Sequence, residues 1–112
     1  MTTHVERLAQ GLMFPEGPAI GQDGALYVTE IAGQRISKID EDGTISTFAD
    51  TGGGPNGAAF NSQGELVVAN NGGRWPTDVP STSQAPEPEF AQGRIQTISR
   101  QGDVLSELSE ID

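Results

Sequence analysis

The stretch FPEGPAIGQDGALYVTE, residues 14–30, is followed by a second copy of its pattern, GPNGAAFNSQGELVVAN, residues 54–70. At a constant offset of 40, small and apolar residues coincide along the two stretches. The coincidences pair Pro15 with Pro55, Gly17 with Gly57, Ala19 with Ala59, Gly24 with Gly64, Leu26 with Leu66 and Val28 with Val68. Matches at so many positions indicate an internal repeat, the usual mark of a protein built from stacked or radially arranged units.

The repeat continues beyond these stretches, but at a longer offset of 59. It pairs Arg35 and Ile36 with Arg94 and Ile95, Ile39 with Ile98, Gly43 with Gly102, and Ile45 with Val104. The difference of 19 (59 minus 40) is an insertion in the second unit, within about residues 71–92. The insertion contains four of the seven prolines, so it is too rich in proline to form a central strand.

Each unit contains four short apolar runs that are typical of strands. They are residues 17–20, 25–29, 35–39 and 45–48 in the first unit, and 57–60, 65–69, 94–99 and 103–108 in the second. Glycine ends the turn sequences QDG, EDG, SQG and RQG between them, and glycine readily adopts the positive φ that tight hairpins need. Four antiparallel strands in about 40 residues are typical of a propeller blade.

We therefore predict an all-β fold made of two four-stranded antiparallel blades of a β-propeller, which is incomplete. Residues 14–52 form the first blade and residues 53–112 the second, with the inserted loop at about 71–92. Residues 1–13 are predicted to contain a leading strand at 5–9, of the kind that completes the last blade of a closed propeller.

Composition excludes several classes of function. The chain has 112 residues and a net charge of −10, with 16 acidic residues against six Lys and Arg, so nucleic acid and anionic membranes are poor partners. It has no cysteine, which excludes disulfides and thiolate zinc sites. The N-terminus has no signal-peptide pattern, and no apolar run reaches membrane-spanning length. We expect a soluble, cytoplasmic protein.

Two blades cannot bury all their apolar surface. Propellers close with about four to eight blades, so two leave one sheet face open on each side. Large exposed apolar faces favour association with other protein surfaces. We expect the remaining propeller blades, or self-association, to cover them. The simplest expectation is a fragment or a truncated reading frame, and a self-assembling multimer is the alternative.

Several polar residues are predicted to share one end of the blades, around the mouth of the central channel. Glu16 and Asn56 occupy equivalent positions in the links that enter the innermost strands. Asn70 and Asn71 follow the second strand of the second unit, and the insertion starts there. The insertion is either a tolerated surface loop or a lid over the channel, in which Arg74 and Trp75 contact a substrate.

The motifs FPEGP (residues 14–18), followed by a DG hairpin, and GPNGAAFNSQGELVVANNGG (residues 54–73) resemble the start of the gluconolactonase family, which includes senescence marker protein (regucalcin). The resemblance covers essentially the whole chain. It implies a six-bladed propeller that hydrolyses sugar lactones with a divalent metal, commonly calcium. The glutamate of the family's EGP motif is a metal ligand, which implies this role for Glu16.

Asn56 resembles one of the family's asparagine ligands by its motif. By repeat order it belongs to the second blade, which usually supplies no ligand, so a role in lining the channel or forming a turn stays open. Oxygen donors of these types suit calcium or magnesium, with manganese and zinc as alternatives. The only histidine, His4, gives no support to a Ser-His-Asp triad or a histidine-rich zinc site.

The sequence thus predicts the N-terminal part of a metal-dependent sugar-lactone hydrolase, inactive as an isolated chain because one ligand cannot hold a cation that prefers about six to eight oxygens. Two alternatives stay open. One is a propeller that acts as a binding module or a lyase without lactonase activity. The other is a non-functional truncated product. No catalytic residue is assigned.

Overall fold

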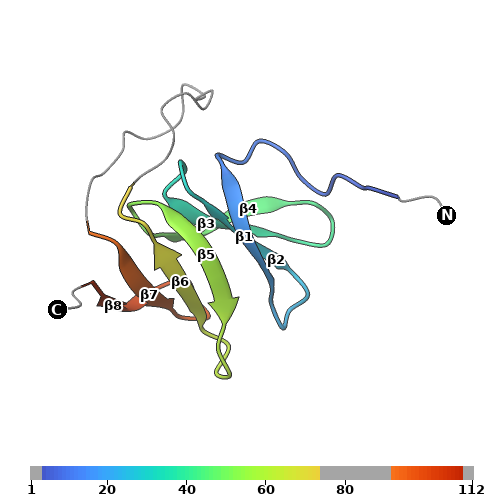
Figure 1. Ribbon diagram of the computed structural model, residues 1–112. Coiled ribbons are helices and arrows are strands. Elements are labelled where there is room, and N and C mark those ends of the chain that lie inside the picture. Colours follow the sequence, from blue (N-terminus) through green and yellow to red (C-terminus); the bar gives the residue numbers. More distant parts are fainter. Residues whose placement is uncertain (1–3, 74–91, 110–112) are drawn as a thin grey trace.

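The computed structural model describes residues 4–73 and 92–109, which form two consecutive four-stranded antiparallel sheets (Figure 1). The strands follow chain order in each sheet. The first sheet comprises β1 (Pro15–Ile20), β2 (Leu26–Glu30), β3 (Arg35–Ile39) and β4 (Ile45–Asp50). The second comprises β5 (Pro55–Phe60), β6 (Leu66–Asn70), β7 (Arg94–Ile98) and β8 (Val104–Leu108). The prediction of an all-β chain with two four-stranded blades is confirmed.

The four hairpin turns share one hydrogen-bond pattern, which explains why the repeat is visible in the sequence. In the turn between β1 and β2, Gly21 N–H donates to the Ala25 carbonyl at 2.9 Å, and Gly24 N–H donates back to the Gly21 carbonyl at 3.0 Å. The other three turns repeat both bonds. The glycines that donate back are Gly24, Gly43, Gly64 and Gly102, with φ of 82°, 87°, 79° and 92°. Glycine adopts this conformation at little cost.

The core lies between the two sheets. The first sheet contributes Ala25, Tyr27, Ile36 and Ala49, and the second contributes Leu66, Val68 and Ile98. The ring of Tyr27 meets Phe48 and Phe60 edge to face, at centroid distances of 4.9 and 5.1 Å. Each large apolar side chain that is fully buried here contributes about 1.5–3 kcal/mol. The sheets are therefore held together mainly by apolar packing, as blades of a propeller are.

The innermost strands β1 and β5 meet at Gly17. A Cβ atom on Gly17, which has a φ of 47°, would lie 2.9 Å from both the Asn56 carbonyl oxygen and the Gly57 Cα. The Thr29 hydroxyl donates to the same Asn56 carbonyl at 3.2 Å. Only glycine permits this close approach of two backbones. The contact fixes the beginnings of β1 and β5 next to each other.

The leading strand predicted at residues 5–9 is not formed, and no residue from 4 to 13 belongs to a strand. A strand needs a sheet edge to pair with, and this segment pairs with neither described sheet. Its apolar side chains Leu8 and Leu12 instead border a groove on the outward face of the first sheet, beside Leu26 and Val28. The segment therefore covers part of a sheet face and extends no sheet.

Candidate functional site

Glu16 and Asn56 are each the second residue of an innermost strand, and both are exposed. Figure 1 shows that the links after β2 and β6 lie at the end where β1 and β5 begin, while the β1–β2 and β5–β6 hairpins lie at the opposite end. Gly17, which follows Glu16, touches the backbone of Asn56 and Gly57. The structure thus places the two predicted site residues at one end of neighbouring strands.

Glu16 borders an open groove of about 380 Å³ between the N-terminal segment and the outward face of the first sheet. The lining is largely apolar, and the other charged residues that border it are Glu6 and Arg7. Because the Glu16 side chain is exposed, its carboxylate is accessible to a cation. Glu16 therefore offers an oxygen donor at the rim of this groove.

A buried carboxylate lies at the end of β2. Glu30 is fully buried, and it accepts hydrogen bonds from Arg35 Nε and Nη2 at 2.8 and 3.0 Å, from the Ser37 hydroxyl, and from Met13 N–H at 2.8 Å. Burial alone raises the pKa of Glu30, but the bonds from Arg35, Ser37 and Met13 outweigh it and lower the pKa below the ordinary 4.5. The carboxylate is therefore charged and fully partnered at neutral pH.

Glu30 fixes the turn that leads into β1. Its bond to Met13 is joined by one between Ile31 N–H and the Phe14 carbonyl, at 3.0 Å, and Phe14 adopts a φ of 58°. These contacts lie just before Glu16 in the chain and hold its backbone in place. Glu30 was not among the residues predicted from the sequence. The available signal was its equivalence, at the repeat offset of 40, to the candidate Asn70.

Asn70 holds the segment that leads into the innermost strand of the second sheet, as Glu30 does in the first. It is buried, and its Oδ1 accepts from Gly54 N–H at 2.8 Å and Gly72 N–H at 2.9 Å. Its Nδ2 donates to the Gly52 carbonyl at 2.9 Å and to Gln96 Oε1 at 3.1 Å. The two donors and two acceptor positions of the amide are all used within the chain. A ligand at Asn70 would have to replace one of these bonds.

Asn71 is half-buried just after β6. Its Oδ1 accepts from Gly73 N–H at 2.9 Å, and its backbone N–H donates to the Gly54 carbonyl at 2.8 Å. These bonds hold the backbone just after β6, where the insertion begins. The other two predicted channel residues, Arg74 and Trp75, lie outside the described residues, as does most of the insertion.

The side chains at the end of the sheets where Glu16 lies offer oxygen donors, which hard cations prefer. Glu16 offers a carboxylate and Asn56 an amide oxygen, both of which suit calcium or magnesium. Within residues 4–73 and 92–109, no three His, Cys, Asp or Glu side chains gather as a metal ion would need. Since calcium takes about six to eight oxygens, these residues can contribute to a metal site but do not complete one.

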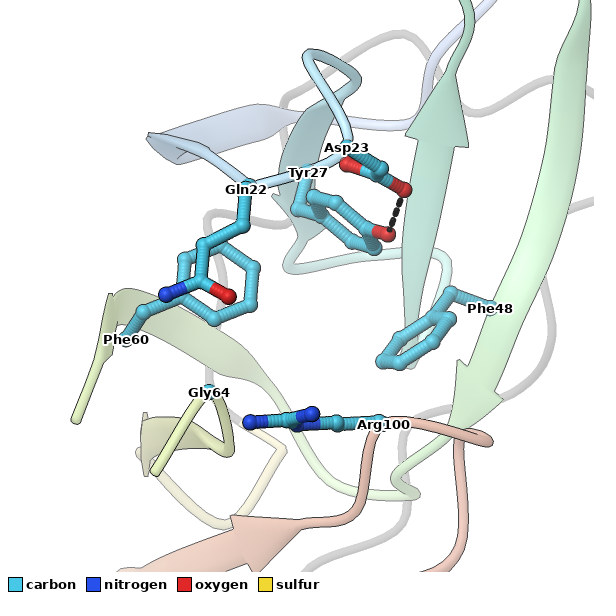
Figure 2. Close-up of a pocket in the computed structure, with 8 residues that line it drawn as sticks. Gln22, Asp23, Tyr27, Phe48, Phe60, Gly64 and Arg100 are labelled. Atoms are coloured by element: carbon cyan, nitrogen blue, oxygen red, sulfur yellow. Dashed lines mark hydrogen bonds between the residues drawn. The ribbon is translucent and has the colours of Figure 1, made fainter. Parts of the chain in front are cut away.

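A second cavity, of about 180 Å³, lies at the opposite end, between the hairpin turns of the two sheets (Figure 2). Tyr27 donates to Asp23 at 2.8 Å, and Lys38 lies 3.2 Å from the same carboxylate. The bond from Tyr27 is the main reason that the pKa of Asp23 is lowered. Across the cavity, Arg100 donates twice to the Gln63 carbonyl, at 3.0 and 2.7 Å. These polar groups tie the turns together, and none is a predicted site residue.

Among the described residues, no helix has the length and apolar character needed to cross a membrane.

Residues 14–104 match the family described as the SMP-30/gluconolactonase/LRE-like region. The solved structure of a gluconolactonase from Xanthomonas campestris, important in glucose secondary metabolic pathways, superposes with a TM-score of 0.55 and 19% sequence identity. The match covers 94% of this chain and 49% of that one, so the chain spans about half the length of that structure. At this identity the likeness establishes a common fold. None of the curated proteins matches. Since the family match covers most of the chain and begins at the motif that contains Glu16, the chain belongs to the SMP-30/gluconolactonase/LRE-like family of β-propellers.

Proposed function

We propose that this chain contributes two adjacent blades and one metal ligand, Glu16, to a metal-dependent sugar-lactone hydrolase. The observation that carries the proposal is the family match, which starts at Phe14 and so includes the exposed Glu16. The likeness to the fold of a gluconolactonase supports a sugar lactone as the substrate class.

In this proposal the chain's own residues have separate tasks. Glu16 binds the cation through its carboxylate, and Asn56 lines the site from the neighbouring strand. Glu30 holds the turn before β1 and so orients the backbone of Glu16. A bound divalent cation, calcium by the preference of these oxygen donors, supplies polarisation of the lactone carbonyl and a lower pKa for an attacking water.

The monomeric chain is expected to be inactive. Glu16 and Asn56 together give far fewer than the about six to eight oxygens that calcium prefers. Isothermal titration of the monomer with calcium should show no saturable binding, and lactone hydrolysis should not exceed the rate in buffer. Turnover by a purified monomer would contradict this proposal.

The role of Glu16 is tested in a complete, active propeller that contains these residues. Glu16→Gln keeps the shape of the side chain but removes the charge. It should lower metal affinity by more than the roughly 10–100-fold typical of an outer-shell partner. Glu41→Gln, in the β3–β4 turn at the opposite end, removes the same charge and should leave affinity unchanged. Equal affinity for wild type and Glu16→Gln would exclude Glu16 from the site.

A further inference from the structure

The repeat relates the packed face of one sheet to the outward face of the other. The second sheet packs against the first through Phe60, Leu66, Val68 and Ile98. At the repeat offsets of 40 and 59, their equivalents are Ile20, Leu26, Val28 and Ile39. The strand register places these equivalents together on the outward face of the first sheet, since Ile20 pairs with Leu26 and Leu26 with Ile39.

The converse also holds. The first sheet packs against the second through Ala19, Tyr27, Ile36 and Ala49. The repeat equivalents of these residues are Ala59, Val67, Ile95 and Leu108, which the register places on the outward face of the second sheet. Ile95 is 42% exposed and Leu108 is 62% exposed. Each outward face is therefore the counterpart of a face that is already packed inside the chain.

The strand residues on the outward face of the second sheet are uncharged, and the register adds Ala69, Thr97 and Ser106 to them. Glutamates take the places of the core residues Ala25 and Phe48 of the first sheet, namely Glu65 just before β6 and Glu107, which pairs with Gln96. The chain as a whole has a net charge of −10. Charges are depleted at the centres of protein interfaces, so this composition is that of a surface that packs against another.

We infer that the outward face of the second sheet binds the outward face of the first sheet of another copy of this chain, head to tail. The contact repeats between copies the packing that β1–β4 and β5–β8 make within one copy. A head-to-tail contact closes into a ring when the rotation allows it. Since propellers have about four to eight blades, a ring would hold two to four copies.

The N-terminal segment is the only described part of the chain that competes for this contact, because it borders the outward face of the first sheet. It covers part of that face, since Val28 and Ile39 are each 5% exposed, whereas Ile20 stays 75% exposed. Residues 4–12 form no strand hydrogen bonds, and the bond from Met13 N–H to Glu30 anchors the end of the segment next to β1. The segment can therefore shift aside when a second copy docks.

Gly57 provides a probe of the contact that does not disturb the fold. Gly17, its repeat equivalent, lies against the backbone of β5, whereas a Cβ on Gly57 would have nothing within 4 Å. In the head-to-tail assembly, Gly57 takes the position of Gly17 and lies against β1 of the next copy. Gly57→Ala should thus leave each chain folded and weaken the assembly.

Light scattering coupled to size-exclusion chromatography tests the inference. At about 100 µM, well above a micromolar Kd, the wild-type chain should have a mass of two to four times 11.7 kDa. Gly57→Ala and Ile95→Glu should reduce it to 11.7 kDa, with unchanged far-ultraviolet circular dichroism. Gln101→Glu adds the same charge in the β7–β8 turn, outside both faces, and should stay assembled.

A mixing experiment tests the head-to-tail geometry. Ile95→Glu keeps the outward face of the first sheet intact, and Ile20→Glu keeps that of the second. Each variant alone should be monomeric, whereas an equal mixture should form pairs of twice 11.7 kDa that cannot grow. Dimers of Ile20→Glu alone would indicate a two-fold contact and overturn the inference. A monomeric wild type would also overturn the inference. In that case the outward face of the second sheet would pack against residues of a longer chain.

Discussion

At the scale of single residues, Glu30 and Asn70 hold equivalent turns by different chemistry. Glu30 is charged and pairs with Arg35 at 2.8 Å. Asn70 is neutral, and Arg94, the equivalent of Arg35, donates instead to the Thr51 carbonyl at 2.9 Å. The buried polar atoms of Glu30 and Asn70 have hydrogen-bond partners, which is the condition for burying them without a large penalty. Arg94 Nε is buried without a hydrogen bond and lies 3.1 Å from the Glu107 carboxylate. The turn in the first sheet is therefore held by a charged carboxylate, and the equivalent turn in the second sheet by a neutral amide.

This difference predicts that removing the Glu30 carboxylate destabilises the chain. Glu30→Ala leaves Met13 N–H and Ser37 without their partner and should lower the free energy of unfolding by about 2–3 kcal/mol. The loss stays moderate because the Arg35 side chain is 30% exposed and can regain water. Glu107→Ala removes a carboxylate that is 47% exposed, and Arg94 keeps its bond to the Thr51 carbonyl, so this change should cost less than about 1 kcal/mol. Equal losses in urea denaturation would contradict this ranking.

The lowered pKa of Glu30 also predicts how stability depends on pH. A carboxyl whose pKa is lower in the folded state than in the unfolded state stabilises the fold above the unfolded value. That stabilisation is lost as the pH falls below about 4.5 and through the lower folded pKa. Glu30→Gln should flatten this part of the curve of unfolding free energy against pH. Parallel curves for wild type and variant would show that Glu30 does not contribute.

At the scale of elements, the contact between β1 and β5 positions the candidate site. It brings Glu16 and Asn56 to the same end because the Gly17 backbone lies against Asn56 and Gly57. The two glycines are repeat equivalents with different surroundings. Gly17 lies between two sheets, while Gly57 faces open space. Glycine at this position of the repeat is therefore required by close packing in the first unit, but not by any contact within the chain in the second.

Alanine at these two positions should have unequal effects on the isolated chain. Gly17→Ala places a Cβ 2.9 Å from backbone atoms at a φ of 47°, and should lower the free energy of unfolding by about 1–3 kcal/mol. Gly57→Ala should change it by less than about 0.5 kcal/mol. Urea denaturation under dilute, monomeric conditions compares the two. A Gly57→Ala chain that is as unstable as Gly17→Ala would refute the assigned β1–β5 contact.

At the scale of the whole molecule, apolar packing between sheets opposes a high negative charge. The core forms at the sheet interface, and the net charge of −10 is spread over a small surface. Few basic residues are available to neutralise it, since the chain has six Lys and Arg against 16 Asp and Glu. Such self-repulsion disfavours the compact state and any assembly of copies.

Salt should therefore stabilise this chain. Raising ionic strength from about 10 to 150 mM shortens the screening length from about 30 to 8 Å and weakens repulsion between distant carboxylates. We expect the Tm to rise, and the proposed assembly to strengthen over the same range. A Tm that falls with salt would mean that the Glu30–Arg35 and Lys38–Asp23 pairs outweigh the net repulsion.

The sequence by itself determined the two sheets, their eight strands and their turns, because each depends on local signals. Alternating apolar runs and glycine turns act within a few residues, and the repeat made them recognisable twice. The same reasoning placed Glu16 and Asn56 at one end, since their positions follow from strand order alone.

Only the tertiary structure decided which polar groups are buried and which faces stay open. The partners of Glu30 range from Met13 to Ser37, and Asn70 bonds Gly52 and Gln96, so no local pattern specifies these networks. Residues 5–9, predicted as a strand that completes a last blade, form no strand with these two sheets, because a strand forms only where another segment offers an edge to pair with.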